Sequence, residues 1–215
     1  MWNNKKLAST CIGSMLIVAL LGLTGCGGVR PEDAVVVKSP QPLVVEPPTL
    51  SSVLPSPADT PAAIHWGFQK DAITLDVFTK GKLNEYNGQP HTLMICLYQL
   101  SARKGFTEYS NSVVGIEKLL TCKNFGSDVT STKRIFIQPD GNQKIVLDRD
   151  EGTKYLGVVA GYYDIVPGLV TRIYEFPISV NKSGMLWWKK SKYSPAKFKT
   201  GILLSPNSMQ TVGGK

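Results

Sequence analysis

Histidine is scarce in this chain of 215 residues, which contains only His65 and His91. Neither has a cysteine, a second histidine or a carboxylate at the spacing that metal ligands usually take. We therefore expect no metal site, and surface or edge positions for both side chains. Nothing in the sequence indicates a cofactor, and no internal repeat is evident.

A complete set of hydrolase motifs is also missing. Ser101–Lys104 (SARK) and Lys199–Gly201 (KTG) match two short motifs of penicillin-binding proteins and β-lactamases. The third motif, S-D-N, is absent, and S-x-x-K follows a predicted strand instead of opening a helix. Cys96 lies in an apolar strand, a poor position for a nucleophile. The sequence therefore predicts no enzyme; a Ser-Lys hydrolase is the alternative, which labelling of Ser101 by a reactive-serine probe would support.

Long apolar runs are few, and the run Ile12–Leu23 is too short for a comfortable transmembrane helix. It follows two lysines and ends in the tetrapeptide LTGC, which matches a bacterial lipobox. This pattern predicts a lipoprotein signal peptide over residues 1–25 and a lipid-carrying N-terminus at Cys26. A plain secretory signal or an anchor helix with a chance cysteine is the alternative.

The residue after the lipidated cysteine and the net charge indicate where the protein acts. Gly27 replaces the aspartate that typically retains lipoproteins in the inner membrane, which favours the periplasmic face of the outer membrane. Loss of Lys5 and Lys6 with the signal lowers the net charge from +8 to +6. A basic periplasmic protein meets anionic lipid, cell wall or an acidic partner, so nucleic acid is not an expected partner.

Cysteines are also few. Cys11 leaves with the signal and Cys26 is acylated, so that Cys96 and Cys122 remain in an oxidising compartment. A disulfide between them would contribute roughly 3–4 kcal/mol in the chain-entropy picture. Two buried thiols are the alternative, because spacing alone does not show that the side chains face each other.

Proline divides the mature chain into two parts. Residues 26–61 contain eight prolines, which interrupt every helix or strand and favour a semi-rigid tether. Residues 62–215 are predicted to form a β-sandwich domain with a C-terminal extension, because short β-patterned segments alternate with turn signals. One short helix is expected over residues 111–121, from its apolar stripe. The strands are expected at residues 73–78, 92–100, 134–138, 144–148, 155–164, 171–180 and 197–204.

The C-terminal extension contains a cluster of tryptophans and lysines, WWKKSKY, over residues 187–193. Such a cluster could lie at a membrane interface or stack against glycan strands. The simplest alternative is a basic hairpin whose tryptophans cover the edge of the sandwich.

Two segments of the predicted domain have distinctive sequences. The first is the turn from Leu83 to Pro90, followed by a strand that ends in Tyr98-Gln99-Leu100. The second is the strand Leu156–Ala160, followed by Tyr162-Tyr163-Asp164. Together with the lipobox and the proline-rich tether, they resemble the outer-membrane lipoprotein family of type VI secretion systems (TssJ or SciN). The resemblance covers about residues 73–180. It departs from the family pattern at Tyr163, where arginine is usual, and at Thr171-Arg172, where Trp-Arg is usual.

The resemblance implies a transthyretin-like, mainly antiparallel β-sandwich that hangs from the outer membrane. It implies binding to the periplasmic C-terminal region of TssM, the large inner-membrane component of the trans-envelope complex. Leu83 and Tyr86 are the apolar anchors that we expect in the partner-binding loop, because the family uses this loop for its partner. The full set of expected contact residues is Lys80, Lys82, Leu83, Asn84, Glu85, Tyr86 and Asn87. An ordinary solvated connection is the alternative for this loop, and a glycan- or cell-wall-binding lipoprotein is the alternative for the whole chain.

Overall fold

The computed structural model describes residues 56–185 and 187–213. The predicted signal peptide, the predicted lipidation site Cys26 and most of the predicted tether lie outside the described residues. Within the described part of the chain, no helix has both the length and the apolar character needed to cross a membrane.

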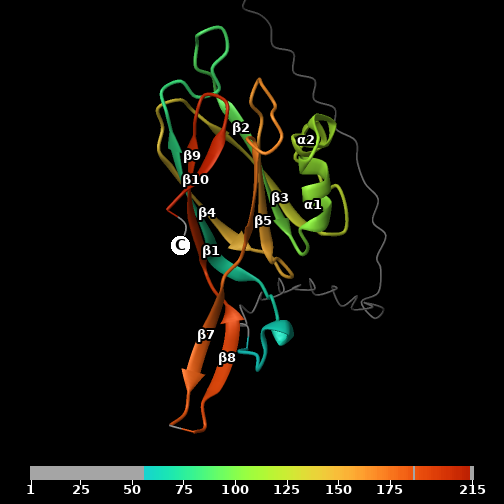
Figure 1. The fold of residues 1–215 in the computed structure, drawn as a ribbon, viewed down its shortest axis with the longest axis vertical. Coiled ribbons are helices and arrows are strands. Elements are labelled where there is room, and N and C mark those ends of the chain that lie inside the picture. Colours follow the sequence, from blue (N-terminus) through green and yellow to red (C-terminus); the bar gives the residue numbers. More distant parts are fainter. Residues whose placement is uncertain (1–55, 186, 214–215) are drawn as a thin grey trace, which may run out of the picture. The chain divides into compact units, whose positions relative to one another are not determined.

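Two four-stranded sheets form the core of the fold (Figure 1). The first has the order β10–β9–β1–β4 and the second the order β3–β2–β5–β6. All neighbouring strands are antiparallel except β1 and β9, which are parallel. The predicted mainly antiparallel sandwich is therefore confirmed. The strands of the two sheets are β1 (Gln69–Thr79), β4 (Gln143–Arg149), β9 (Phe198–Leu204), β10 (Met209–Val212), β2 (Leu93–Leu100), β3 (Val129–Ile137), β5 (Tyr155–Ala160) and β6 (Thr171–Glu175).

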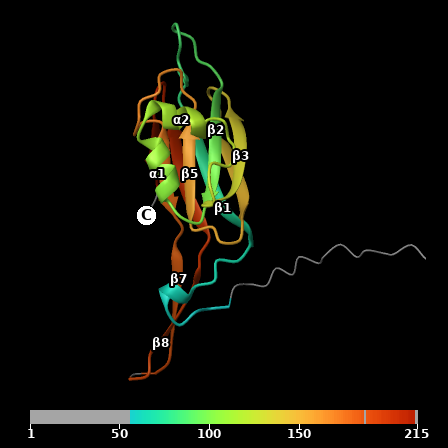
Figure 2. The same ribbon diagram turned by 90° about the vertical axis from the view of Figure 1, so that its right-hand side faces the viewer.

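Strand β2 is covered on both faces, as its apolar sequence predicts. Gln99 lies on the face that meets the first sheet, where its amide donates to the carbonyl of Asp148 on β4 (2.9 Å). The opposite face carries Cys96 and Tyr98, both of which are fully buried. Figure 2 shows the helices α1 (Lys104–Ser110) and α2 (Val113–Leu119) lying over this face of the second sheet.

The predicted single helix over residues 111–121 corresponds to α2, whereas α1 is a second helix that the sequence analysis missed. Helix α1 buries only Phe106, so it has no apolar stripe that a periodicity argument could detect. Phe106 packs over Gly157 on β5, where a Cβ atom would lie only 2.6 Å from its ring. The glycine thus makes room for the helix on the sheet.

A disulfide between Cys96 and Cys122 joins β2 to the turn after α2, with Cα atoms 5.4 Å apart. The two cysteines are therefore bonded rather than free thiols. Beside the disulfide, the hydroxyl of Tyr98 donates a hydrogen bond to the carbonyl of Leu119 in α2. Burial raises the pKa of Tyr98 to about 12. Both links hold the helical pair against the second sheet.

The strand predicted over residues 171–180 is wrong as a single element. It divides into β6 and β7 (Ile178–Ser183), which belong to different sheets. The break falls at Phe176, which is buried against Phe198, and at Pro177, which cannot donate a ladder hydrogen bond. Three further boundaries differ by four residues or more: β1 begins at Gln69 instead of residue 73, β3 begins at Val129 instead of residue 134, and β5 ends at Ala160 instead of residue 164. Strands β8 (Lys190–Pro195) and β10 were not predicted.

Strands β7 and β8 form a separate two-stranded hairpin, which extends away from the two sheets (Figure 1). The tryptophans at its turn, Trp187 and Trp188, are 90% and 82% exposed. The basic hairpin is thus present, but the expectation that its tryptophans cover the edge of the sandwich is wrong. Ala58 pairs with Tyr193 of β8 through two backbone hydrogen bonds of 2.8 and 2.9 Å.

Candidate partner-binding site at the loop between β1 and β2

The loop over residues 80–92 contains a tight turn, and the sequence of this turn accounts for its geometry. Tyr86 and Gln89 exchange backbone hydrogen bonds of 2.9 and 3.0 Å. Asn87 and Gly88, between them, have φ values of +51° and +76°. A two-residue turn with positive φ at both positions is of type I′, for which Asn-Gly is the preferred sequence. The turn therefore holds Tyr86 at a defined position beside it.

Leu83 and Asn84 are buried, although both were expected to contact a partner. Leu83 is fully buried and belongs to the hydrophobic core, so its predicted role as an exposed anchor is incorrect. The amide of Asn84 donates to the carbonyl of Thr92 (3.2 Å) and accepts from the backbone N–H of Tyr163 (3.0 Å). Asn84 thus joins the loop to the segment that follows β5. Leu83 and Asn84 therefore hold the loop in position instead of contacting a partner.

An exposed aromatic stack lies above these buried residues. The rings of Tyr86 and Tyr163 are stacked, with centroids 4.7 Å apart and planes 24° apart. His91 meets the ring of Tyr163 edge-on, at 5.2 Å. Tyr86 is 52% exposed and Tyr163 is 57% exposed. Exposed aromatic pairs on a fixed backbone are a favourable surface for protein recognition, because little entropy is lost when they are covered.

Three of the remaining predicted contact residues are charged. The exposed Lys82 forms an ion pair with the half-buried Glu85 (3.4 Å), and Lys80 and Asn87 are also exposed. The backbone N–H of Lys80 donates to Leu204 of β9 (3.1 Å), and that of Glu85 donates to Pro206 (3.2 Å). The loop is therefore tied to the β9–β10 turn as well as to its own strands.

Tyr163 is the site residue that the sequence analysis missed. It appeared there only as a departure from the family pattern, in the pair Tyr162-Tyr163. The structure separates the two tyrosines: Tyr162 is buried and its hydroxyl donates to the carbonyl of Ser208 (2.7 Å), which leaves Tyr163 on the surface. Burial also raises the pKa of Tyr162. The one available signal in the sequence was that two adjacent tyrosines in an extended segment point to opposite sides, so that one of them faces outward.

The hydrolase-like motifs are not assembled. The hydroxyl of Ser101 donates to the carbonyl of Asp128 (3.2 Å), and Lys104 pairs with Glu108 (3.9 Å). Lys199 pairs with Asp76 on β1 (3.1 Å). The side chains of Ser101, Lys104 and Lys199 therefore each have a partner outside the motifs. Among the described residues, no group of three or more histidine, cysteine or acidic side chains is placed to hold a metal ion.

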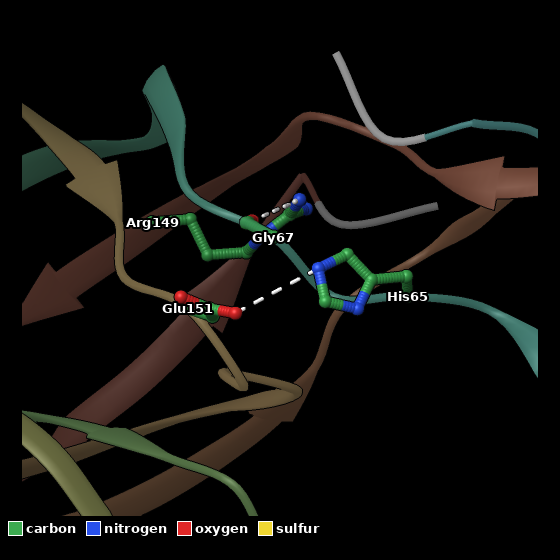
Figure 3. Close-up of polar contacts among 4 residues, drawn as sticks. All are labelled: His65, Gly67, Arg149 and Glu151. Carbon is green, nitrogen blue, oxygen red and sulfur yellow. Dashed lines mark hydrogen bonds and ion pairs between the residues drawn. The ribbon is translucent and has the colours of Figure 1, made fainter. Parts of the chain in front are cut away.

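A buried arginine forms a separate polar cluster (Figure 3). Arg149 is fully buried, donates to the carbonyl of Gly67 (3.3 Å) and lies 5.3 Å from the ring centroid of Trp66. Burial lowers its pKa. His65 and Glu151, 3.7 Å apart, are both exposed, which agrees with the edge position expected for His65. This cluster lies at the end of β4, whose last residue is Arg149.

The fold and the site define a β-sandwich protein whose exposed loop surface is suited to binding another protein. The chain belongs to the family of type VI secretion lipoproteins, described as VasD, EvfM and TssJ, whose model matches residues 71–186. The predicted family is thereby confirmed, and its description is that of a lipoprotein of a secretion system. No curated protein matches the chain.

Three solved structures are similar to this chain. The type VI lipoprotein TssJ1 from Pseudomonas aeruginosa is 18% identical and has a TM-score of 0.51; the match covers 68% of this chain and 98% of that one. Lip from Serratia marcescens, a membrane-bound component of the type VI secretion system, is 15% identical, with a TM-score of 0.49 and coverage of 66% and 98%. A structure described as the TssM C-terminal domain (869–1107) from EAEC is 17% identical, with a TM-score of 0.48 and coverage of 66% and 98%. At these identities the likeness concerns the fold alone.

Proposed function

We propose that this chain is the outer-membrane lipoprotein of a type VI secretion membrane complex. Acylated Cys26 anchors it to the periplasmic face of the outer membrane, and the sandwich binds the periplasmic C-terminal region of a TssM-like inner-membrane protein. Membership of the lipoprotein family and the lipobox sequence support this assignment. The role is one of assembly, without a catalytic step.

The observation that carries the site is the exposed stack of Tyr86 on Tyr163, held from below by the buried Asn84. In the proposed interface the two rings supply most of the apolar contact, because truncation of central aromatic residues costs most of the affinity in protein interfaces. Lys80 and Lys82 increase the association rate with an acidic partner surface and add less to affinity.

A binding titration tests this proposal. The mature chain, residues 26–215, is titrated with the periplasmic C-terminal domain of the cognate TssM-like protein, and then as the double variant Tyr86→Ala/Tyr163→Ala. We expect the double variant to bind about tenfold more weakly or worse, which corresponds to about 1.4 kcal/mol. Phe136→Ala is the matched control, because Phe136 is an aromatic residue of β3 that is 59% exposed and lies outside the loop.

The outcomes separate the function from the site. Binding that is unchanged by the double variant would move the interface to another surface. A folded wild-type chain that does not bind the TssM-like domain at all would refute the assembly function. Lys80→Gln/Lys82→Gln should lower the association rate more than it raises the dissociation rate, and this difference should disappear at high salt.

A further inference from the structure

The hairpin β7–β8 carries strong positive charge without a compensating acid. Residues 178–195 contain four lysines and no aspartate or glutamate. Lys182, Lys189 and Lys190 are exposed, whereas Lys192 pairs with Asp59 (2.7 Å), a residue outside the hairpin. The free surface of the hairpin is therefore complementary to a layer of negative charge.

The turn of the hairpin presents apolar side chains that no other described part of the chain covers. Met185 is 80% exposed, beside the exposed Trp187 and Trp188. Across the turn, the N–H of Trp188 donates to the carbonyl of Met185 (3.1 Å). Gly184 has a φ of +112° and lies so close to the carbonyl of Trp188 that a side chain could not fit. A built turn that exposes two tryptophans indicates that something covers them in the working protein.

The chemistry of this tip favours lipid over sugar. Tryptophan is enriched where a protein meets the headgroup layer of a membrane, and nearby lysines bind anionic lipid phosphates. Sites that orient a polar ligand place a few donors and acceptors among their aromatic residues. Residues 178–195 contain no aspartate, glutamate or glutamine, so that Asn181 is the one carboxylate or amide side chain of the hairpin that could accept hydrogen bonds from sugar hydroxyls.

The hairpin also lies where the chain arrives from Cys26. Ala58 pairs with Tyr193, and Asp59 with Lys192, so the first described residues run along β8. The pairing of β5 with its neighbour shows which segments lie at each end of the sandwich. Its first residue, Tyr155, pairs with Glu175, just before the hairpin, and its last strand residue, Ala160, precedes the segment of Tyr163. The hairpin and the loop between β1 and β2, to which Tyr86 belongs, therefore lie at opposite ends of the sandwich (Figure 1).

We propose that the hairpin tip docks on an anionic phospholipid bilayer, with Trp187 and Trp188 in the headgroup layer and Lys182, Lys189 and Lys190 on the lipid phosphates. The second part of this inference rests on the proposed function: the bilayer is the one that holds Cys26. Docking then fixes the orientation of the sandwich, with its partner-binding loop directed away from that membrane. The lipid anchor attaches the protein to the membrane, and the hairpin tip sets the orientation of the sandwich relative to it.

Vesicle flotation tests the docking without help from the lipid anchor. The mature chain carrying Cys26→Ser is mixed with vesicles of phosphatidylethanolamine and phosphatidylglycerol, or of phosphatidylcholine alone. We expect binding to the anionic vesicles that weakens as salt rises, and Trp187→Ser/Trp188→Ser should weaken it about tenfold or more. Lys189→Gln/Lys190→Gln should weaken it and flatten its salt dependence. Phe136→Ser is the control variant and should bind as the wild type does.

A second measurement locates the tryptophans. Nitroxide lipids with the label near the headgroup should quench the fluorescence of the wild-type chain, and the quenching should disappear in Trp187→Ser/Trp188→Ser, which retains Trp66. Absence of binding to the anionic vesicles by a folded chain would overturn the proposal. Retention of one or more cell-wall glycan fractions in place of vesicles, lost in the same variant, would also overturn it and assign the tip to glycan.

The partner titration keeps this proposal separate from the proposed function. Trp187→Ser/Trp188→Ser should bind the TssM-like domain with wild-type affinity, because the tip lies at the far end from Tyr86 and Tyr163. If the chain binds vesicles but not the TssM-like domain, the proposed assembly function is refuted and the proposed membrane contact is supported. If it binds the TssM-like domain but not vesicles, the membrane contact is refuted and the assembly function is supported.

Discussion

The two ends of the sandwich present aromatic residues in different ways. At the loop end, Tyr86 and Tyr163 are exposed, but the loop also contains Leu83, which belongs to the hydrophobic core, and Asn84, which is buried and accepts from the N–H of Tyr163. At the hairpin end, every residue of β7 is exposed. The shape of the loop end therefore depends on the packing of the domain. Substitutions on β7 should affect folding less than substitutions at Leu83.

The largest effect that separates the two ends is expected for Leu83→Ala. Removal of a fully buried leucine side chain should lower the free energy of unfolding by about 2–5 kcal/mol. Val180→Ala on β7 is the matched change at the other end, and should shift it by about 0.5 kcal/mol or less. Urea unfolding followed by circular dichroism measures both. Equal losses in the two variants would show that the hairpin is as integral to the fold as the loop.

A smaller effect is expected for Asn84→Ala. The substitution leaves the N–H of Tyr163 and the carbonyl of Thr92 without their partner, which should cost about 1–3 kcal/mol. Asn84 also has a φ of +48°, a backbone conformation that disfavours alanine. Asn87→Gly is the control, because glycine adopts the positive φ of this exposed position without strain. A loss in Asn84→Ala no greater than in the control would contradict the positioning role.

The smallest effect concerns the contact between Asp59 and the hairpin. The hydrogen bond from Lys192, and then its charge, lower the pKa of Asp59 below its ordinary 3.8. The contact therefore stabilises this pairing above pH 3.8 and is lost as the pH falls through the lowered pKa. We expect the amide signals of Ala58 and Tyr193 to titrate in that acidic range by NMR. Asp59→Asn should abolish the titration; persistence in this variant would assign it to another group.

The sequence predicted the elements whose evidence is local and missed those that depend on distant contacts. Strands such as β2 and β5 follow from apolar, β-favouring runs, and the type I′ turn follows from Asn87-Gly88. Leu83 seemed exposed because its neighbours in the sequence are polar, but its burial depends on core residues far away in the chain. Helix α1 was missed because Phe106 alone anchors it, over a glycine of a later strand.

The candidate site was predicted in part, and for the same reason. Its loop and Tyr86 follow from the family resemblance, whereas Tyr163 enters through a hydrogen bond between segments that are far apart in sequence. The break between β6 and β7 could have been predicted from Pro177, since proline cannot serve as an interior ladder residue. The exposure of the hairpin tip, in contrast, could not be predicted. The same local sequence would fit tryptophans that pack against the edge of the sandwich.

The parallel pairing of β1 with β9 has a consequence for the order in which the protein folds. The edge of β1 at Ile73 stays unpaired until Phe198, the first residue of β9, has been made and has folded against it. The second sheet and its disulfide join segments that are closer in sequence, so they can form before the C-terminal strands take their places. Until Phe198–Leu204 pairs with it, β1 has an open edge, the kind of edge that recruits other chains. The last strands of the chain thus set how long the newly made protein stays vulnerable to aggregation.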